Sequence, residues 1–335
     1  MNELTTADYA DQHGISTSTV RRRIADGTLA ARRIGRDWII QDTPKPTGPA
    51  PGSPEWLRLM SASKVAAVLG VSPYQSPFSL WHEMKGATRA EATAVQQRGH
   101  LLEAAVLDWW YTEHGVTPGT GNRQHTAYLG DWGIATLDDV VLTLDGMVGL
   151  EAKTTGSWDE WGEEQTDEVP AHYYAQAVWQ LACDPALVRI YLPVLGPRLD
   201  FRWYAVERDN ALIASVIRKC REFYDSLEQD VAPELDDHKA TLAVLKRMHP
   251  DIDEETDAVI TDDLAAEYVS ADLAYKAAED AKRAAQSKVL AEAGVARYVK
   301  NAAGLTIARR QPNRSGVSLV RVAKTIPAPA LEAVA

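Results

Sequence analysis

The segment 138–153 constrains the fold of this chain more strongly than any other part of the sequence. Apolar and β-branched residues run up to Asp145-Gly146 and resume directly after it. An Asp-Gly pair between two such runs is the strongest short-range signal of a β-hairpin. If Asp145 and Gly146 are the two turn residues, Leu144 pairs with Met147 and the strands continue on both sides.

The predicted register brings charged side chains to one face of this hairpin. Val140 lies opposite Glu151, and Asp138 lies opposite Lys153. Because side chains alternate between the two faces of a strand, Asp138, Glu151 and Lys153 share a face, while Asp139 points to the other. A three-residue turn would invert this assignment and give the role to Asp139. We therefore expect Asp138 to act with Glu151 and Lys153.

Two carboxylates and an amine on one face are the groups that phosphodiester hydrolysis requires. The reaction needs charge on the phosphate to be neutralised and a hydroxide to form at neutral pH. One or two Mg²⁺ ions held by carboxylate oxygens can do both, and a lysine orients the attacking water or stabilises the transition state. Glu-x-Lys is common by itself, so a surface hairpin with solvated charges is the alternative. The flanking sequence favours the metal-dependent site.

The chain has 335 residues, of which 45% are apolar, enough for two or three domains with sizeable cores. No apolar run reaches the roughly 18 residues of a membrane span, and the N-terminus lacks a signal-peptide pattern. Two cysteines, Cys183 and Cys220, exclude a four-cysteine zinc or iron–sulfur site and do not indicate a disulfide framework. These features predict a cytoplasmic protein with no membrane partner.

Charge is distributed unevenly along a chain whose net charge is −12. Residues 21–36 contain six arginines and one aspartate, whereas residues 234–292 contain fifteen acidic and seven basic residues. The total argues against a protein that coats nucleic acid by charge alone. The distribution favours a nucleic-acid contact near the N-terminus.

Residues 1–42 have the pattern of a small DNA-binding module. A helix begins after a capping threonine at residue 5, Gly14 makes a turn, and Ser16 or Thr17 caps a second helix. Residues 29–40 read as a β-hairpin wing. The module resembles the excisionase/MerR-type winged helix-turn-helix, whose second helix enters the major groove. An arginine-rich solvated helix in a structural module is the alternative. By the resemblance, the residues that would face DNA are Ser18, Thr19, Arg21, Arg22, Arg23, Arg32, Arg33 and Arg36.

Residues 43–55 hold five prolines and read as a semi-rigid linker. Residues 56–231 follow as the main domain, whose order of helices and strands predicts an α/β sandwich rather than a repeat array. The predicted helices are 56–69, 78–85, 94–114, 171–183 and 210–229, and the predicted strands are 133–137, 140–144, 147–153, 188–194 and 199–206.

Residues 232–335 turn acidic and alanine-rich. A heptad-like stripe predicts an antiparallel helical hairpin, followed by strands near 296–299 and 304–309. The region reads either as a structural extension or as an arm that binds a partner. The stripe consists of Leu264, Tyr268, Ala271, Tyr275, Ala278, Ala285 and Val289, interrupted by Lys282.

The main domain resembles the YqaJ-type viral recombinases, relatives of phage lambda exonuclease within the PD-(D/E)xK nuclease superfamily. Four blocks carry the resemblance, in the order of the family. They are Ser61 to Trp81, Arg98-Gly-His-Leu-Leu-Glu103, Ile134-Ala-Thr-Leu-Asp138 with Gly149-Leu-Glu151-Ala-Lys153, and Val169 to Gln176. The chain departs from the family at Leu137, where proline is usual, and at Asp139, where glycine is usual. The resemblance implies a restriction-endonuclease-like core, a central mixed sheet flanked by helices.

The resemblance also implies roles for individual residues. Asp138 and Glu151 would bind Mg²⁺, with Mn²⁺ as an alternative ion, and Lys153 would orient the water. The Ala152 carbonyl and Glu103, on its helix, would be further metal ligands. The remaining implied roles are binding of the 5′-phosphate and of the nucleophile. Ser61 or Ser63 would sit near the 5′-phosphate with Arg58, or Arg98 in its place, as the charged partner, and Gln176 would line the active site.

As a whole, the resemblance implies a Mg²⁺-dependent exonuclease that degrades one strand of duplex DNA 5′→3′ in phage recombination. It also implies a homo-oligomer and a single-strand annealing protein as partner. The alternatives are an endonuclease of the same superfamily and a DNA-binding regulator that uses the nuclease fold as a scaffold. Gln180 reads as structural, and the histidines at positions 82, 100, 114 and 172 lack metal-ligand spacing.

Overall fold

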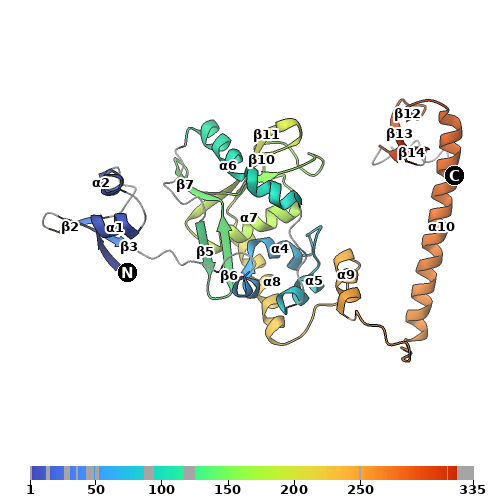
Figure 1. The fold of residues 1–335 in the computed structure, drawn as a ribbon, viewed down its shortest axis with the longest axis horizontal. Coiled ribbons are helices and arrows are strands. Elements are labelled where there is room, and N and C mark those ends of the chain that lie inside the picture. The colour runs from blue at the N-terminus through green and yellow to red at the C-terminus, as the bar shows by residue number, and fades with distance from the viewer. Residues whose placement is uncertain are drawn as a thin grey trace. The chain divides into compact units, whose positions relative to one another are not determined.

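The computed structural model describes residues 2–12, 16–25, 31–34, 37–42, 49, 53–86, 94–116, 125–248, 250–314 and 316–322. The chain divides into two compact units, Met1–Pro250 and Asp251–Ala335 (Figure 1). Most of the predicted linker 43–55, the predicted turn at Gly14 and the side chains of Arg23 and Arg36 lie outside the described residues. Within these ranges no helix combines the length and the apolar character needed to cross a bilayer.

The N-terminal residues form two helices and a three-stranded antiparallel sheet of order β1-β3-β2. The predicted helices and hairpin are present, and strand β1 was not predicted. Ser16 caps α2, because its Oγ accepts a hydrogen bond from the Thr19 amide at 3.2 Å. A small core of Ala10, Val20 and Ile40 holds the elements together. They are β1 Asn2–Thr5, α1 Thr6–Gln12, α2 Thr17–Ala25, β2 Ala31–Ile34 and β3 Asp37–Asp42.

The main domain has a mixed five-stranded sheet, as expected. Its order is β11-β10-β8-β7, with β9 also paired to β10. Strand β10 runs parallel to β8 and β9, and the other pairs are antiparallel. A smaller sheet has the order β4-β6-β5. The strands are β4 Met60–Ser61, β5 His125–Leu129, β6 Gly133–Leu137, β7 Asp139–Thr143, β8 Gly146–Leu150, β9 Lys153–Thr154, β10 Leu187–Leu195 and β11 Phe201–Glu207.

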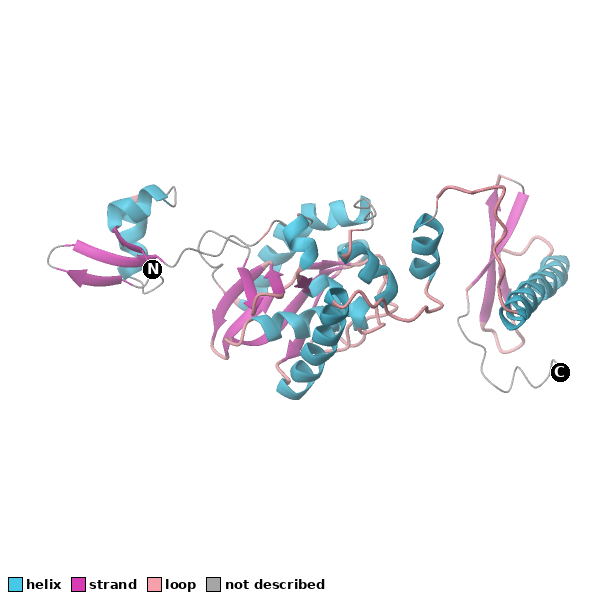
Figure 2. Ribbon diagram, turned by 90° about the horizontal axis from the view of Figure 1, so that it is seen from below, coloured by secondary structure: helices cyan, strands magenta, loops and turns pink. Residues whose placement is uncertain are grey.

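Helices cover both faces of the larger sheet (Figures 1 and 2). Helix α6 packs on one face, where Leu107 and Trp110 meet Val148 and Leu150. Helices α4, α7 and α8 form the larger core on the other face. The helices are α3 Pro54–Arg58, α4 Ala62–Val68, α5 Pro77–Met84, α6 Ala94–His114, α7 Ala171–Cys183, α8 Asn210–Glu228 and α9 Lys239–Met248, with a 3-10 turn at Pro197–Leu199.

The hairpin forms, but its turn lies one position earlier than predicted. Thr143 pairs with Gly146, so Leu144 and Asp145 are the turn residues. The Thr143 hydroxyl accepts from the Asp145 amide at 3.3 Å and donates to the Gly146 carbonyl at 3.0 Å, which stabilises this turn. Gly146 has a φ of +125°, which glycine adopts without steric cost.

The predicted strand pairings are therefore wrong by two residues. Val140 pairs with Gly149 and not with Glu151, and Asp139 pairs with Leu150. Because side chains alternate with a period of two, a shift of two leaves each side chain on the predicted face. Asp138 therefore lies on the predicted face although the predicted register is wrong.

The predicted helix 56–69 is also wrong, since the chain leaves the helical conformation at Leu59 (φ −90°, ψ 148°). Met60 and Ser61 pair in parallel with Gly133 and Ile134 of β6. The buried Lys64 ammonium donates to the carbonyls at the end of α3, at 3.3 Å for Trp56, 2.8 Å for Leu57 and 2.7 Å for Leu59. This side chain satisfies the helix end that the break creates.

In the C-terminal region the predicted apolar stripe lies along one long helix and not along the two arms of a helical hairpin. Helix α10, Asp262–Ala293, begins at a Thr261 cap and ends at Gly294. No glycine or proline interrupts it, which explains why no turn forms. A three-stranded antiparallel sheet follows, of β12 Tyr298–Lys300, β13 Thr306–Asn313 and β14 Gly316–Arg321. The acidic region before α10 includes α9, which belongs to the first unit, where Thr241 and Ser76 share a buried hydrogen bond of 2.6 Å.

Candidate active site

The backbone between β6 and β7 positions Asp138. Its amide donates to the Leu150 carbonyl at 3.0 Å, and its Oδ2 accepts from the Ala152 amide at 2.7 Å. The neighbouring Asp139 is turned to the opposite face of the sheet, where its Oδ2 accepts from the Tyr111 hydroxyl at 2.5 Å. The structure therefore brings Asp138, and not Asp139, to the segment that carries Glu151.

Glu151 is buried and both of its carboxylate oxygens are engaged. Oε1 accepts from Lys153 Nζ and from Gln176 Nε2, each at 2.6 Å. Oε2 accepts from Gln180 Nε2 at 2.6 Å. Gln176 and Gln180 are one turn apart on α7, so a single helix face holds the carboxylate. The sequence indicated this shared face, but we interpreted Gln180 as structural and missed its contact with Glu151.

The electrostatics of the site centre on Asp138. Its pKa is raised to about 8, first by burial and then by the charges of Glu151 and Glu103, against the opposing effects of Lys153 and the Ala152 amide. Glu103 lies on α6 and is near enough for its charge to raise the pKa of Asp138 further. Negative charge at this position exceeds what a single lysine compensates.

Lys153 is held as the protonated amine. Burial lowers its pKa, but the charges of Glu151 and Asp138 outweigh this effect, and the pKa is raised above its ordinary value. Its Nζ lies 5.0 Å from the ring centroid of Tyr173 on α7. The predicted role of Lys153 as a positive charge next to the carboxylates is consistent with this geometry, and Tyr173 is a contact that sequence reasoning missed.

The donor chemistry of the site fits a hard divalent cation such as Mg²⁺. The carboxylates of Glu151 and Glu103 are near enough for their charges to act on Asp138, and its raised pKa marks negative charge that a cation would compensate. Across the described residues, no group of three His, Cys, Asp or Glu side chains already has its ligand atoms arranged around a common point. Glu151 would therefore exchange a hydrogen bond with Lys153, Gln176 or Gln180 for a bond to the ion.

The predicted phosphate-binding residues fall on α3, β4, α4 and α6. Ser61 is buried and its Oγ lies 3.2 Å from that of Ser63, which is exposed. Arg58 and Arg98 are both exposed. The structure thus brings the two serines together and leaves both arginine side chains open to solvent.

Three of the four histidines that lack metal-ligand spacing pack against aromatic rings. The His114 ring stacks on Trp110 at 4.1 Å between centroids, and His172 lies 4.0 Å from the Tyr173 ring. His82 packs on Phe78, and burial lowers its pKa. His100 is exposed, with its Nδ1 3.7 Å from a Glu103 carboxylate oxygen.

The predicted DNA-facing residues of the N-terminal module are largely exposed. Ser18, Arg21 and Arg22 on α2 are open to solvent, as are Arg32 and Arg33 on β2. Thr19 is half-buried, and its hydroxyl lies 2.9 Å from that of the capping serine.

Comparison with known proteins finds a family match within the main domain and one similar curated protein. Residues 55–185 match the model of the YqaJ-like viral recombinase domain. The "Uncharacterized protein YqaJ" of Bacillus subtilis (strain 168) is 27% identical over 209 residues, which cover 58% of this chain and 63% of that protein. The chain therefore spans less than two thirds of the length of this relative.

Two exonuclease structures are also similar to the chain. An alkaline exonuclease (LHK-Exo) from Laribacter hongkongensis is 21% identical, with a TM-score of 0.38, over 58% of this chain and 94% of that chain. A phage related exonuclease from Haemophilus somnus 129PT is 14% identical, with a TM-score of 0.39, over 51% of this chain and 96% of that chain.

Proposed function

We propose that this chain is a Mg²⁺-dependent DNA exonuclease that degrades one strand of linear duplex DNA 5′→3′ in phage-type homologous recombination. The observation that carries the proposal is the pair of carboxylates Asp138 and Glu151, whose charges act on each other, with the Lys153 ammonium 2.6 Å from a Glu151 oxygen. The match of residues 55–185 to the YqaJ-like viral recombinase domain supports the same reading.

Each residue of the site has a defined task under this proposal. Asp138, Glu151 and Glu103, with the Ala152 carbonyl, hold the ion. Bound Mg²⁺ would supply positive charge to the phosphate and make water more acidic. Lys153 keeps its proton and orients the attacking water or stabilises charge on the phosphate in the transition state.

The two glutamines of α7 have different tasks. Gln176 contacts Glu151 at the solvent side of the helix face and holds the nucleophile or the phosphate. Gln180 is fully buried and keeps the Glu151 carboxylate in one orientation. We assign Gln180 as a positioning residue.

Recognition of a 5′-phosphate would give the reaction its direction. Ser61 and Ser63 supply hydroxyl donors beside each other, and Arg58 or Arg98 supplies the positive charge. An enzyme that binds the 5′-terminal phosphate in this way requires a free DNA end, which explains why it would act on linear duplex DNA.

The N-terminal module would recruit the enzyme to DNA or regulate its own operon. The exposed Arg21 and Arg22 on α2, together with Arg32 and Arg33 on β2, support a phosphate contact. A single-strand annealing protein, which would take up the strand that digestion exposes, and further copies of the chain are the expected partners.

The substrate form tests the proposal. A linear duplex with 5′-phosphate, the same duplex with 5′-hydroxyl, and a covalently closed circle are incubated with the full chain in Mg²⁺ and in EDTA. We expect rapid digestion of the phosphorylated duplex, slower digestion of the hydroxyl form, no cutting of the circle, and no activity in EDTA. Cutting of the circle would assign an endonuclease, and inactivity with Mg²⁺ and Mn²⁺ would favour a DNA-binding regulator.

A further inference from the structure

Helix α10 is long and has almost no packing of its own. None of its 32 residues is buried. Its half-buried residues are Ala265 near the start and Gln286, Val289, Leu290 and Ala293 at the C-terminal end, where the helix contacts β12. Helices in proteins obtain most of their stability from tertiary packing of an apolar face. The rest of α10 is therefore expected to pack against another chain.

An apolar stripe at alternating spacings of three and four residues runs along α10. Its large members are well exposed, with Leu264 at 51%, Tyr268 at 71% and Tyr275 at 63%. Between and after them the stripe continues with Ala271, Ala278 and Ala285, and Lys282 is its one charged position. Such spacing is that of a coiled-coil seam.

A second apolar row on α10 is too short to form a seam. Val269 and Leu273 are exposed off the stripe, but the same row continues with Lys276 and Asp280.

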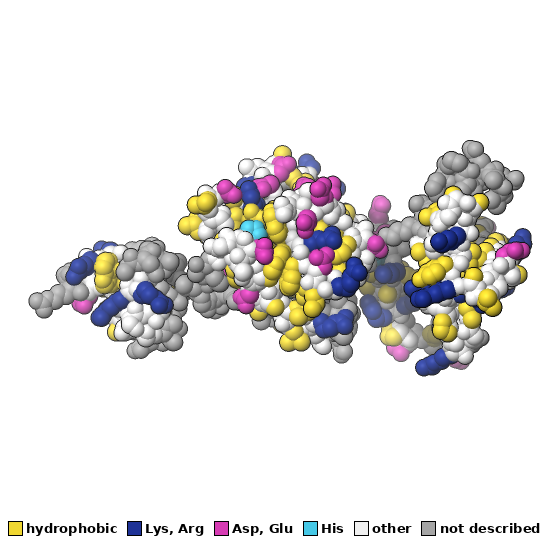
Figure 3. Space-filling model, turned by 90° about the horizontal axis from the view of Figure 1, so that it is seen from above, with side chains coloured by type: hydrophobic (Ala, Val, Ile, Leu, Met, Phe, Trp, Pro, Cys, Tyr) yellow, Lys and Arg dark blue, Asp and Glu magenta, His cyan; other side chains and the backbone are white. Residues whose placement is uncertain are grey.

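The two ends of α10 carry opposite charge. Residues 251–263 contain seven Asp or Glu and no Lys or Arg, whereas residues 294–322 contain six Lys or Arg and no Asp or Glu. Figure 3 shows Lys and Arg side chains on the C-terminal unit, which contains the sheet of β12, β13 and β14. The 32-residue helix separates the two ends by roughly 48 Å at 1.5 Å per residue, so they cannot meet within one chain.

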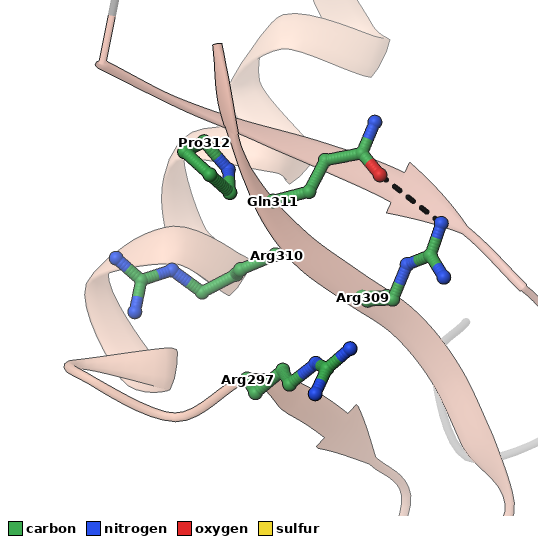
Figure 4. Close-up of a pocket in the computed structure, with 5 residues that line it drawn as sticks. All are labelled: Arg297, Arg309, Arg310, Gln311 and Pro312. Atoms are coloured by element: carbon green, nitrogen blue, oxygen red, sulfur yellow. Dashed lines mark hydrogen bonds between the residues drawn. The ribbon is translucent and has the colours of Figure 1, made fainter.

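The basic end contains a hollow of about 350 Å³ lined by Arg297, Arg309, Arg310, Gln311 and Pro312 (Figure 4). Arg310 donates to the carbonyls of Gly294 and Ala296, and Arg309 donates to Gln311 at 3.0 Å. In the described part of the chain, the buried Nε atoms of Arg309 and Arg310 have no hydrogen-bond partner. Guanidinium groups with free donors suit carboxylates.

We propose that α10 pairs antiparallel with α10 of a second copy of this chain, and that residues 251–263 of each copy lie against the arginine-lined hollow of the other. The pairing places Leu264 opposite Val289, Tyr268 opposite Ala285 and Tyr275 opposite Ala278. Each tyrosine then meets an alanine, so large and small side chains interdigitate. This inference does not depend on the proposed function.

A parallel pairing fits the sequence less well. It would place Tyr268 against Tyr268 and one acidic end against the other. The antiparallel register instead continues residues 251–263 past the end of the partner helix, where Arg297 lies.

Two adjacent alanines provide a matched test. Ala278→Glu places a charge in the seam, and Ala277→Glu places the same charge beside it. In sedimentation equilibrium of the full chain, we expect Ala278→Glu to raise the dissociation constant of self-association at least about tenfold, a change of about 1.4 kcal/mol, and Ala277→Glu to leave it nearly unchanged. Equal behaviour of the two variants would overturn the proposal.

Cross-linking tests the orientation. Cys183 and Cys220 are buried, so introduced cysteines report alone. A mixture of Ala271→Cys and Lys282→Cys chains should form a mixed disulfide dimer, because these positions face each other in the antiparallel register. Ala271→Cys alone should not cross-link. A disulfide dimer of Ala271→Cys alone, or none in the mixture, would contradict the antiparallel arrangement.

Charge reversal tests the occupant of the hollow. Arg309→Glu should weaken self-association, and added salt should weaken it in the wild type. The same change is made in an Asp138→Asn chain, whose DNA binding can be followed without digestion. If Arg309→Glu weakens DNA binding and leaves self-association unchanged, the hollow binds nucleic acid and the acidic occupant is wrong.

Discussion

Replacing Asp138 with asparagine should remove activity and, without a divalent ion, stabilise the main domain at alkaline pH. Asparagine has the shape of aspartate and can still accept from the Ala152 amide. It removes a negative charge that is buried beside Glu151 and Glu103. This charge should lower the free energy of unfolding of the wild type, and the size of the effect should depend on pH.

The sign follows from the direction of the shift. The pKa of Asp138 is raised from 3.8 to about 8 in the folded state. A neutral Asp138 therefore contributes its full stability below about pH 4 and loses it progressively as pH rises toward 8. Since one pKa unit corresponds to about 1.4 kcal/mol, the loss is on the order of 5 kcal/mol, a large part of the stability of a typical domain.

Tryptophan fluorescence during urea unfolding measures this effect, because nine of the ten tryptophans lie between residues 56 and 203. In EDTA, the free energy of unfolding of the wild type should fall relative to Asp138→Asn between pH 4.5 and pH 8.5. At pH 8, Mg²⁺ at a hundred times its dissociation constant should stabilise the wild type by about 2.7 kcal/mol and the variant far less. If the difference in free energy of unfolding between the two proteins does not change with pH, the pKa of Asp138 is not raised. If Mg²⁺ stabilises both proteins equally, Asp138 does not bind the ion.

Three further predictions address single contacts. Lys153→Gln should reduce digestion by at least about a hundredfold, as expected for loss of a transition-state charge, while retention of DNA on filters stays near wild type; unchanged digestion would show that the amine has no part in the chemistry. Lys64→Met should lower the free energy of unfolding by roughly 3 kcal/mol, because three carbonyls at the end of α3 lose their donor; urea titration measures this, and a loss below about 1 kcal/mol would contradict it. The double change Arg21→Ala with Arg22→Ala should weaken DNA binding and reduce the slope of log K against log salt by about two; an unchanged slope would exclude α2 from the phosphate contact.

The placement of Asp138 and Glu151 in the candidate site was predictable because the signals for it are local. The alternation of strand side chains assigned Asp138 and Glu151 to one face, and a register error of two residues did not change that assignment. The one-turn spacing of Gln176 and Gln180 likewise indicated a common helix face. Local periodicity could not show that Gln180 reaches Glu151, since that contact joins α7 to a distant strand.

The errors share a non-local cause. Helix propensity favoured a continuous helix over 56–69, but pairing of Met60 and Ser61 with β6 breaks it. Strand β5 was missed because it is defined by its pairing with β6. The helical stripe in the C-terminal region was recognised, but the absence of a glycine or proline between 262 and 293 was underweighted, and the whole stripe lies on one helix.

We infer that Asp138, on the sheet face that also carries Glu151, binds the ion that the nuclease reaction needs. Asp139 is the adjacent carboxylate on the opposite face, and its asparagine variant keeps partners for Tyr111 and Val140. The most direct measurement is the initial rate of nucleotide release from a 5′-phosphorylated linear duplex in Mg²⁺ by the wild type, Asp138→Asn and Asp139→Asn. We expect loss of release for Asp138→Asn and near wild-type release for Asp139→Asn. Digestion that survives Asp138→Asn, or that is lost only with Asp139→Asn, would contradict it.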